Sequence, residues 1–189
     1  ATSNVFKVEA ANEFELLRSA AIYGPNASGK SNFLRALQTM KHIVLESAAS
    51  QQRGDRLPVT PFRLSVDTRQ APSEFEVTFL VDGVRYQYGF SATPEQIHEE
   101  WLLAYPKGRA QRWFTRVWAA DKKQFEWELG SSLTGEKQLW QKSTRDNALF
   151  LSTAVQLNSE QLQPVFDWFK TTLRMSNVGG WAPSFSASL

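Results

Sequence analysis

One eight-residue stretch constrains this chain more than any other feature of its sequence. Residues 24–31 read GPNASGKS and match the pattern G-x-x-x-x-G-K-[ST] in full. By residue frequencies, a chain of 189 residues contains this pattern by chance on the order of 1% of the time. The pattern places a glycine-rich loop between a strand and a helix, where backbone N–H groups and the helix dipole can hold phosphate. It therefore predicts a phosphate-binding loop.

The residues on both sides of this loop fit the required context. The small and apolar run Ser19–Tyr23 predicts a strand before the loop. Residues 29–47 have helical spacing, with an apolar face made by Leu34, Leu37, Met40 and Val44. Residues 47–61 are polar and interrupted by glycine and proline, so they predict a surface loop.

Phosphate chemistry assigns a role to each part of the loop. The two glycines allow the backbone to approach phosphate, and Lys30 places its charge on the β- and γ-phosphates as the expected catalytic residue. The hydroxyl of Ser31 is expected to ligate Mg²⁺. The residues expected to contact ATP are Gly24, Pro25, Asn26, Ala27, Ser28, Gly29, Lys30, Ser31 and Asn32. The alternative is a glycine-rich turn with a solvated Lys30.

The next part of the chain changes to the period of a β-strand. Apolar residues alternate over Phe75–Val81 and again over Tyr86–Phe90, and Asp82-Gly83 between them indicates a type I′ turn. Further strand-like runs at 97–105, 112–118 and 124–129 complete an antiparallel sheet of about five strands. Residues 137–142, 147–156 and 160–173 again have helical patterns and predict three helices. Ser159, just before the last of them, resembles an N-cap. The expected fold is α/β (α+β), divided into 1–63, 64–130 and 131–189.

Composition excludes several classes of protein. The chain has no Cys and two His, so a disulfide scaffold, a thiolate metal site and a zinc hydrolase are disfavoured. No apolar run approaches the length of a membrane span and no signal peptide is evident, which predicts a soluble cytoplasmic protein. The net charge of +2 is too small to indicate nucleic-acid binding.

The loop and its flanks resemble a known group of ATPases. SAAIYGPNASGKSNFLRAL, with Pro-Asn inside the loop, resembles the ABC-class P-loop ATPases of the SMC, RecF and OLD-nuclease branch. More narrowly, it resembles predicted ATPases of prokaryotic anti-phage and abortive-infection operons. PFRL (61–64), HEEWLL (98–103) and TRDNALFLSTAVQLN (144–158) have the texture of that narrower family. The resemblance implies a Walker A lobe, an antiparallel sheet and then a helical part.

The resemblance also implies further catalytic groups, which the sequence supplies only in part. Asp82 ends the only run resembling a Walker B strand, but Gly83 follows it, so we interpret it as a turn residue. Gln156 is the best candidate for a Q-loop glutamine that would contact nucleotide and, with Ser31, Mg²⁺; an ordinary surface glutamine is the alternative. His98 is interpreted as a strand residue, and His42 as a solvated or rim residue of the helix. Without a Walker B or signature motif, and without an initial Met, we expect an incomplete nucleotide-binding domain with slow ATP turnover.

Other polar groups support weaker hypotheses. Lys107, Arg109, Arg112 and Arg116 are interleaved with aromatic residues, as in a nucleic-acid-binding hairpin or a protein-binding one, although ordinary strand alternation explains them as well. In that alternation Trp113 shares a strand face with Thr115 and Val117. Glu99 and Glu100 are expected on opposite faces of a strand, so they cannot form an acid/base pair. Arg145 could reach a phosphate, and Asp146 is expected to cap a helix.

These observations lead to one main hypothesis and two alternatives. The main one is an ATPase module that dimerises, or forms a higher homo-oligomer, around ATP and Mg²⁺ and controls an effector protein, by resemblance a nuclease in anti-phage defence. The first alternative is a DNA-repair or chromosome-maintenance ATPase of the RecF type. The second is a scaffold in which ATP binding holds an oligomer together and sequesters a toxic partner.

Overall fold

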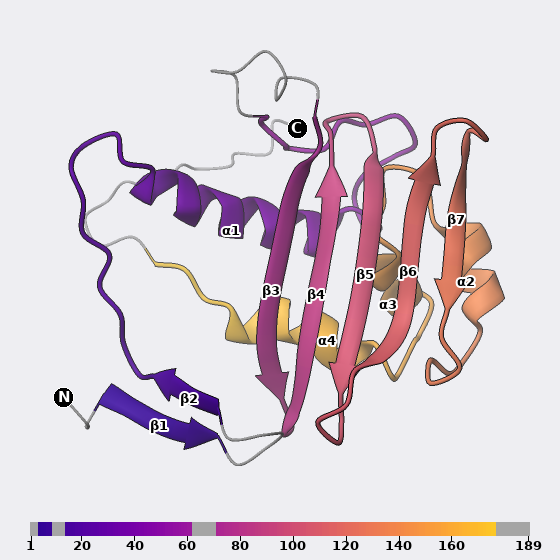
Figure 1. The fold of residues 1–189 in the computed structure, drawn as a ribbon. Helices are drawn as coiled ribbons and strands as arrows, with labels where there is room; N and C mark the ends of the chain where they lie inside the picture. The colour runs from indigo at the N-terminus through magenta and orange to yellow at the C-terminus, as the bar shows by residue number, and fades with distance from the viewer. Residues whose placement is uncertain (1–3, 9–13, 62–70, 177–189) are drawn as a thin grey trace.

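A five-stranded antiparallel sheet organises the part of the chain that the computed structural model describes, residues 4–8, 14–61 and 71–176. Its strands are β3 (Ser73–Val81), β4 (Val84–Ala92), β5 (Ile97–Tyr105), β6 (Gln111–Ala119) and β7 (Gln124–Leu129). They follow one another in space in the order of the sequence (Figure 1). The mixed α/β fold with a five-stranded antiparallel sheet, expected from the alternating pattern, is confirmed.

The turn between β3 and β4 has the predicted geometry. Asp82 and Gly83 both have positive φ angles, 49° and 76°, as a two-residue type I′ turn requires. The pairing begins at Val81 and Val84 and continues in register to Ser73 and Ala92. The carboxylate of Asp82 therefore belongs to a hairpin turn.

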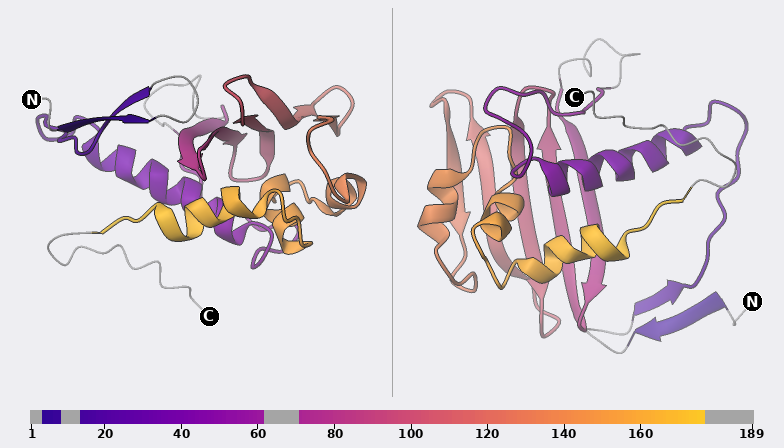
Figure 2. Two further views of the ribbon diagram at one scale, coloured as in Figure 1. Left: turned by 90° about the horizontal axis from the view of Figure 1, so that it is seen from below. Right: turned by 180° about the vertical axis from the view of Figure 1, so that it is seen from behind.

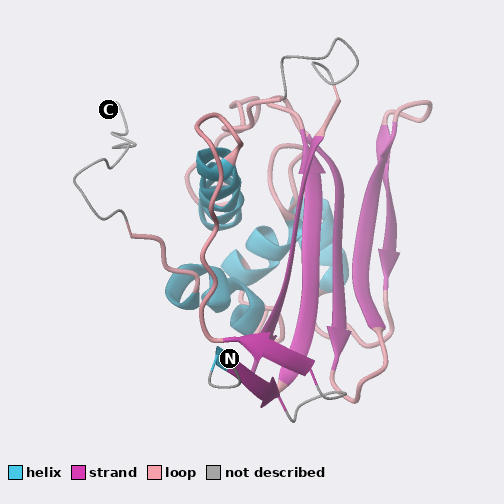
Figure 3. Ribbon diagram, turned by 60° about the vertical axis from the view of Figure 1, so that its left-hand side comes forward, coloured by secondary structure: helices cyan, strands magenta, loops and turns pink. Residues whose placement is uncertain are grey.

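Within the described residues, the helices lie on one face of this sheet and none lies on its other face (Figures 2 and 3). They are α1 (Lys30–Glu46), α2 (Lys137–Ser143), α3 (Phe150–Gln156), α4 (Gln163–Asp167) and the π-helical turn η2 (Trp168–Thr172). The helix predicted for 147–156 begins three residues late, and the one predicted for 160–173 is shared between α4 and η2. The Ser159 hydroxyl accepts a hydrogen bond from the amide of Leu162 at 3.4 Å, close to its predicted capping role.

The core fills the space between the covered face of the sheet and the helices. Aromatic rings make many of these contacts: the centroids of Phe79 and Trp168 are 4.1 Å apart, and those of Phe114 and Phe150 are 4.7 Å apart. Buried residues come from both layers: Met40, Ile43, Val44, Tyr88, Phe90, Ile97, Leu102, Phe114, Leu149, Phe150, Leu162 and Phe169. Each large apolar side chain buried here contributes about 1.5–3 kcal/mol.

A β-bulge changes which side chains of β6 enter the core. The pairing of β5 with β6 shifts between Leu102 and Leu103, which leaves Trp113 as the extra residue. Trp113 is buried, and its ring lies 5.5 Å from that of Tyr86 on the covered face. The expectation that Trp113 shares a face with Thr115 and Val117 is therefore wrong.

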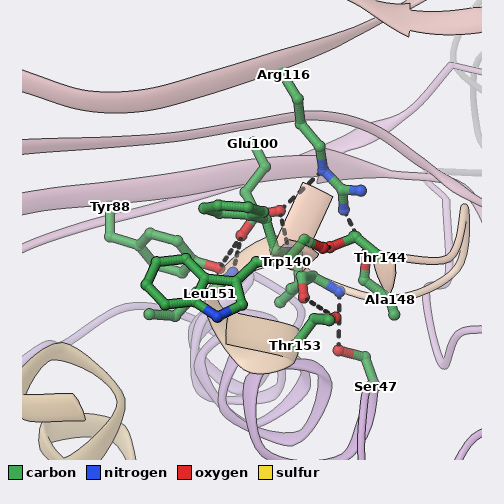
Figure 4. A network of polar contacts seen from close by, with 11 residues as sticks. Ser47, Tyr88, Glu100, Arg116, Trp140, Thr144, Ala148, Leu151 and Thr153 are labelled. Carbon is green, nitrogen blue, oxygen red and sulfur yellow. Dashed lines mark hydrogen bonds and ion pairs between the residues drawn. The ribbon is translucent and has the colours of Figure 1, made fainter. Parts of the chain in front are cut away.

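A buried polar cluster lies between β4, β5, β6 and α3 (Figure 4). The carboxylate of Glu100 forms an ion pair with Nε of Arg116 at 2.9 Å and accepts a hydrogen bond from the hydroxyl of Tyr88 at 3.0 Å. All three side chains are fully buried. The Cζ atom of Arg116 lies 4.8 and 5.4 Å from the ring centroids of Phe125 and Trp127, within cation–π range.

Glu100 also attaches the helical layer to the sheet. Its two carboxylate oxygens accept hydrogen bonds from the amides of Phe150 at 2.7 Å and Leu151 at 3.0 Å, and Arg116 donates to the carbonyl of Ala148. The residue before α3, Leu149, offers no capping side chain. A carboxylate from the sheet thus caps α3 and complements its dipole.

The N-terminal region differs from expectation. Residues 19–23 have no regular secondary structure and pair with no strand in the described part of the chain, and 65% of Ile22 and 90% of Tyr23 is exposed. The strand predicted at Ser19–Tyr23 is therefore not formed, because a strand needs a hydrogen-bonded neighbour. The hairpin β1 (Val5–Val8) with β2 (Phe14–Leu17) was not predicted.

The polar loop after α1 is also less exposed than predicted. Leu57 and Val59 are buried in the core, and the amide of Leu57 donates to the carbonyl of Pro94 at 2.7 Å. Of the PFRL segment at 61–64, only Pro61 belongs to the described residues.

Gly89 offers a test of the packing on the uncovered face of the sheet. A Cβ atom there would lie 2.3 Å from Cζ2 of Trp101 and 2.8 Å from the carbonyl oxygen of Phe75. We expect Gly89→Ala to lower the free energy of unfolding by about 1–3 kcal/mol, measured by urea denaturation. The control Ser91→Ala on the same strand should stay within about 0.5 kcal/mol of the parent. Equal stabilities for the two variants would contradict this packing.

The buried cluster predicts a loss of stability at alkaline pH. Burial raises the pKa of the Tyr88 hydroxyl well above its usual value of 10.0, and the negative charge of Glu100 raises this pKa further. The folded state then keeps a proton that the unfolded chain releases, so the stability contributed by Tyr88 is lost from about pH 10 upward. Tyr88→Phe should be about 1.5–3 kcal/mol less stable at neutral pH. Its stability should fall less steeply in urea titrations above about pH 10; parallel curves would contradict the assignment.

Candidate phosphate-binding site

The loop at residues 24–29 has a backbone conformation suited to binding an anion. Ala27 and Gly29 have positive φ angles of 65° and 93°, and the amide of Ser28 closes a turn on the carbonyl of Pro25 at 3.3 Å. Alternation between right- and left-handed conformations turns successive N–H groups toward one side of a loop. A Cβ atom on Gly24 would lie 2.7 Å from the Ser28 hydroxyl. Gly24 therefore keeps the loop closely folded.

Lys30 is folded back onto this loop. Its Nζ donates hydrogen bonds to the carbonyls of Gly24 at 2.6 Å and Pro25 at 2.7 Å, and to the hydroxyl of Ser28 at 3.2 Å. An ammonium group has three donors, and all three are used by the loop itself. The positive charge is thus held at the loop, where a bound phosphate would take over these bonds.

The first turn of α1 has no acidic side chain and no capping side chain that could bind its N–H groups. Gly29 is its N-cap and has no side chain to offer, and no residue of the first turn is acidic. The first N–H groups of the helix are therefore available to a ligand and carry its partial positive charge. Ser31 lies in this turn and is exposed, so its hydroxyl is accessible to a metal ion bound beside phosphate. These residues fit a nucleotide phosphate with Mg²⁺.

Gln156 is not brought to this loop. It is exposed at the last residue of α3, and α3 packs on the C-terminal part of α1, where Ser152 Oγ donates to the carbonyl of Val44 at 2.6 Å. Val44 lies about 20 Å along the helix axis from Lys30, at 1.5 Å per residue. The shared role of Ser31 and Gln156 in binding Mg²⁺ stays a prediction.

The four basic residues predicted as a cluster do not share one surface: Arg116 is buried, and the other three are exposed. Arg116 faces the core, where burial lowers its pKa and the charge of Glu100 opposes that shift. Arg112 is exposed but forms an ion pair with Glu128. Lys107 and Arg109 lie exposed in and after the β5–β6 turn. The prediction that Arg116 contacts nucleic acid is wrong, because its side chain is fully buried.

Arg145 and Asp146 also have roles other than those predicted. The side chain of Arg145 does not lie at the loop of residues 24–31. Its Nη2 donates to the carbonyls of Ser47 and Gln51, both at 2.9 Å, near the opposite end of α1. Asp146 does not cap α3, because Glu100 does so. The bonds of Arg145 were missed because they join positions nearly 100 residues apart, and no local pattern signals them.

The remaining candidates behave as sequence reasoning expected. Glu99 and Glu100 diverge, since Glu100 enters the core while Glu99 stays partly exposed. His98 is partly buried with Nε2 at 3.2 Å from the Thr93 hydroxyl, and burial lowers its pKa. His42 is half-buried about three turns along α1 from Lys30.

Two further properties hold within the described ranges. No group of three or more His, Cys, Asp or Glu side chains is arranged to hold a metal ion. No helix there combines the length and the apolar composition that a bilayer crossing demands.

Ala27 allows a test of strain in the loop. Its φ of 65° lies in the left-handed region, which costs a residue with a Cβ about 1–2 kcal/mol and costs glycine little. We expect Ala27→Gly to raise the free energy of unfolding by about 1 kcal/mol. The same change at the exposed helical position Ala36 should lower it by about 0.5–1 kcal/mol. A loss of stability in both variants would show that the loop is not strained.

Comparison with known proteins places this geometry in a family. Residues 19–163, which include the loop, α1 and the whole sheet, match the family described as "AAA domain, putative AbiEii toxin, Type IV TA system". Comparisons with curated proteins and with solved structures gave no match. Because the match covers more than half of the chain and contains the loop that holds Lys30, the chain belongs to this family of P-loop AAA-type ATPase domains.

Proposed function

We propose that this chain binds ATP with Mg²⁺ at residues 24–31 and Asn32, as the nucleotide-binding part of an ATPase. The observation that carries the proposal is Lys30, which donates to the loop carbonyls at 2.6 and 2.7 Å beside a helix N-terminus without an acidic or capping side chain. Both features place positive potential at one point. Membership of the AAA family supports the same ligand.

In the proposed complex, each group acts on one part of the nucleotide. The loop amides bind the phosphate oxygens, and Lys30 exchanges its bonds to the loop for bonds to the β- and γ-phosphates. Ser31 supplies a hydroxyl ligand to Mg²⁺, which neutralises phosphate charge when bound. We assign no residue of this chain as the carboxylate that would activate water. We therefore propose that these residues bind nucleotide, and that hydrolysis is an activity of the ATPase to which they belong.

We further propose that nucleotide binding brings two copies together and controls an effector, a nuclease in anti-phage defence. The family description, with its reference to the AbiEii toxin and a type IV toxin–antitoxin system, supports a role of this kind. The resemblance of residues 19–37 to the SMC, RecF and OLD branch supports dimerisation on ATP. Contact with nucleic acid through Lys107, Arg109 and Arg112 stays a prediction.

Thermal stabilisation by nucleotide tests the central claim. ATP with Mg²⁺ at a hundred times its dissociation constant should stabilise the parent by about 2.7 kcal/mol. Lys30→Ala should lose most of this effect, because the charge facing the phosphates is gone. The control Lys107→Ala removes an exposed lysine of the β5–β6 turn and should respond like the parent.

Three results would count against the proposal. One is an equal melting shift for Lys30→Ala and the parent, and another is no shift in the parent at saturating ATP. The third is a shift that Lys107→Ala reduces as much as Lys30→Ala does, which would indicate charge attraction without a specific site. Sedimentation with and without ATP tests the proposed dimer separately.

A further inference from the structure

The first two turns of α1 are not anchored to the rest of the described chain. Residues 31–36 are all exposed, including 53% of Phe33 and 52% of Leu34. The buried residues of the helix, Met40, Ile43 and Val44, belong to its C-terminal half. The apolar face predicted from Leu34 to Val44 is thus buried only at one end. Within the described residues, the contacts that fix α1 therefore lie in its C-terminal half.

Most polar contacts of this far, C-terminal end of α1 are made with the segment 145–152, and Nζ of Lys41 also donates to the carbonyl of Leu173 at 2.6 Å. Nη2 of Arg145 donates to three carbonyls at and beyond the end of α1, those of Ser47, Ala48 and Gln51, at 2.9, 3.3 and 2.9 Å. Such terminal carbonyls lack partners inside the helix and carry its negative dipole end, which a cation complements. Arg145 therefore acts as a cationic C-cap supplied from elsewhere in the sequence.

Three more bonds join the same two segments. The amide of Leu149 donates to the Ser47 hydroxyl at 3.1 Å, and the hydroxyl of Ser152 donates to the carbonyl of Val44 at 2.6 Å. Asn147 Nδ2 donates to the carbonyl of Gln52 at 2.7 Å. The end of α1 and the start of α3 consequently form one hydrogen-bonded unit.

This unit continues into the sheet. The amides next to that of Leu149, those of Phe150 and Leu151, are bonded to the buried carboxylate of Glu100 (Figure 4). Hydrogen bonds and the intervening backbone of residues 149–151 therefore connect the C-terminal end of α1 to the Glu100–Arg116 pair. A helix is stiff over the length of α1, so ordering its N-terminus reduces motion at its C-terminus.

We propose that Arg145 is a positioning residue for nucleotide binding, which fixes α1 against α3 and couples occupancy of the loop to the amides of residues 149–151. This inference rests on the proposed function, because the loop must bind nucleotide for the coupling to exist. Coupling between two sites is reciprocal, so weakening the far end of α1 must also weaken binding at the loop.

Hydrogen exchange on the full chain, with and without ATP and Mg²⁺, tests the coupling. In the parent, ATP should slow exchange both at residues 24–31 and at residues 149–151, the latter by about threefold or more. In Arg145→Gln, ATP should still slow exchange at the loop but no longer at 149–151, and affinity for ATP should fall by about fivefold or more.

Matched variants separate positioning from simple loss of stability. Arg145→Lys keeps the cation and should restore part of both effects, and Ser152→Ala should resemble Arg145→Gln. Arg56→Gln, which loses only an exposed ion pair with Glu95, should match the parent. A purely structural role would speed exchange at 149–151 equally with and without ATP, and that result would overturn the inference.

The outcomes distinguish this inference from the function beneath it. If ATP leaves residues 24–31 of the parent unchanged, nucleotide binding itself is refuted. If ATP slows exchange at the loop but not at residues 149–151 of the parent, binding stands and the coupling is overturned. If Arg145→Gln does not fold, Ser152→Ala gives the same comparison.

Discussion

The buried ion pair between Glu100 and Arg116 is the constraint on which the rest of this structure depends. Two charges removed from water are costly unless further hydrogen bonds satisfy them. Glu100 receives such bonds from the amides that begin α3 and from the hydroxyl of Tyr88, and Nη2 of Arg116 donates to the carbonyl of Ala148. Nη1 of Arg116 is buried without a hydrogen-bond partner in the described part of the chain, so its charge depends on Glu100. The bonds to α3 and Ala148 form only when the helical layer docks on the sheet in one register. Burial of apolar side chains favours docking of the helices on the sheet in many arrangements, and the Glu100–Arg116 pair favours the one arrangement that gives it these hydrogen bonds.

The parts of the structure that sequence reasoning predicted correctly are those with local causes. The strand limits followed from alternation, and the β3–β4 turn followed from Asp82-Gly83, which are suited to two consecutive left-handed conformations. The loop at 24–29 and the helix that follows it were predicted from adjacent glycines, lysine and serine; their binding of phosphate stays a proposal. In each case the residues that decide the conformation are neighbours in the chain.

The parts that sequence reasoning missed depend on residues far apart in the chain. Arg116 shares a strand face with Phe114 by alternation, and burial of its charge depends on Glu100 of β5 and on the carbonyl of Ala148, neither of which is a neighbour in the chain. The bulge that turns Trp113 inward arises from the register between two strands, which periodicity alone does not specify. Ser19–Tyr23 has the composition of a strand, but its conformation depends on a neighbour that the composition does not reveal.

Helix α1 must be anchored in the core and must also leave its N-terminus accessible at the loop. The C-terminal half of the helix meets the first requirement and the N-terminal half meets the second. Its C-terminal half gains stability from burial of Met40, Ile43 and Val44 and from carbonyl capping by Arg145. Its N-terminal half must leave its first N–H groups free, since a capping side chain or an acidic residue there would compete with phosphate. A short helix without tertiary packing is marginal in water. The buried end must therefore hold the exposed end in helical form, and under the function proposed above the same anchoring bonds would also position the phosphate-binding loop.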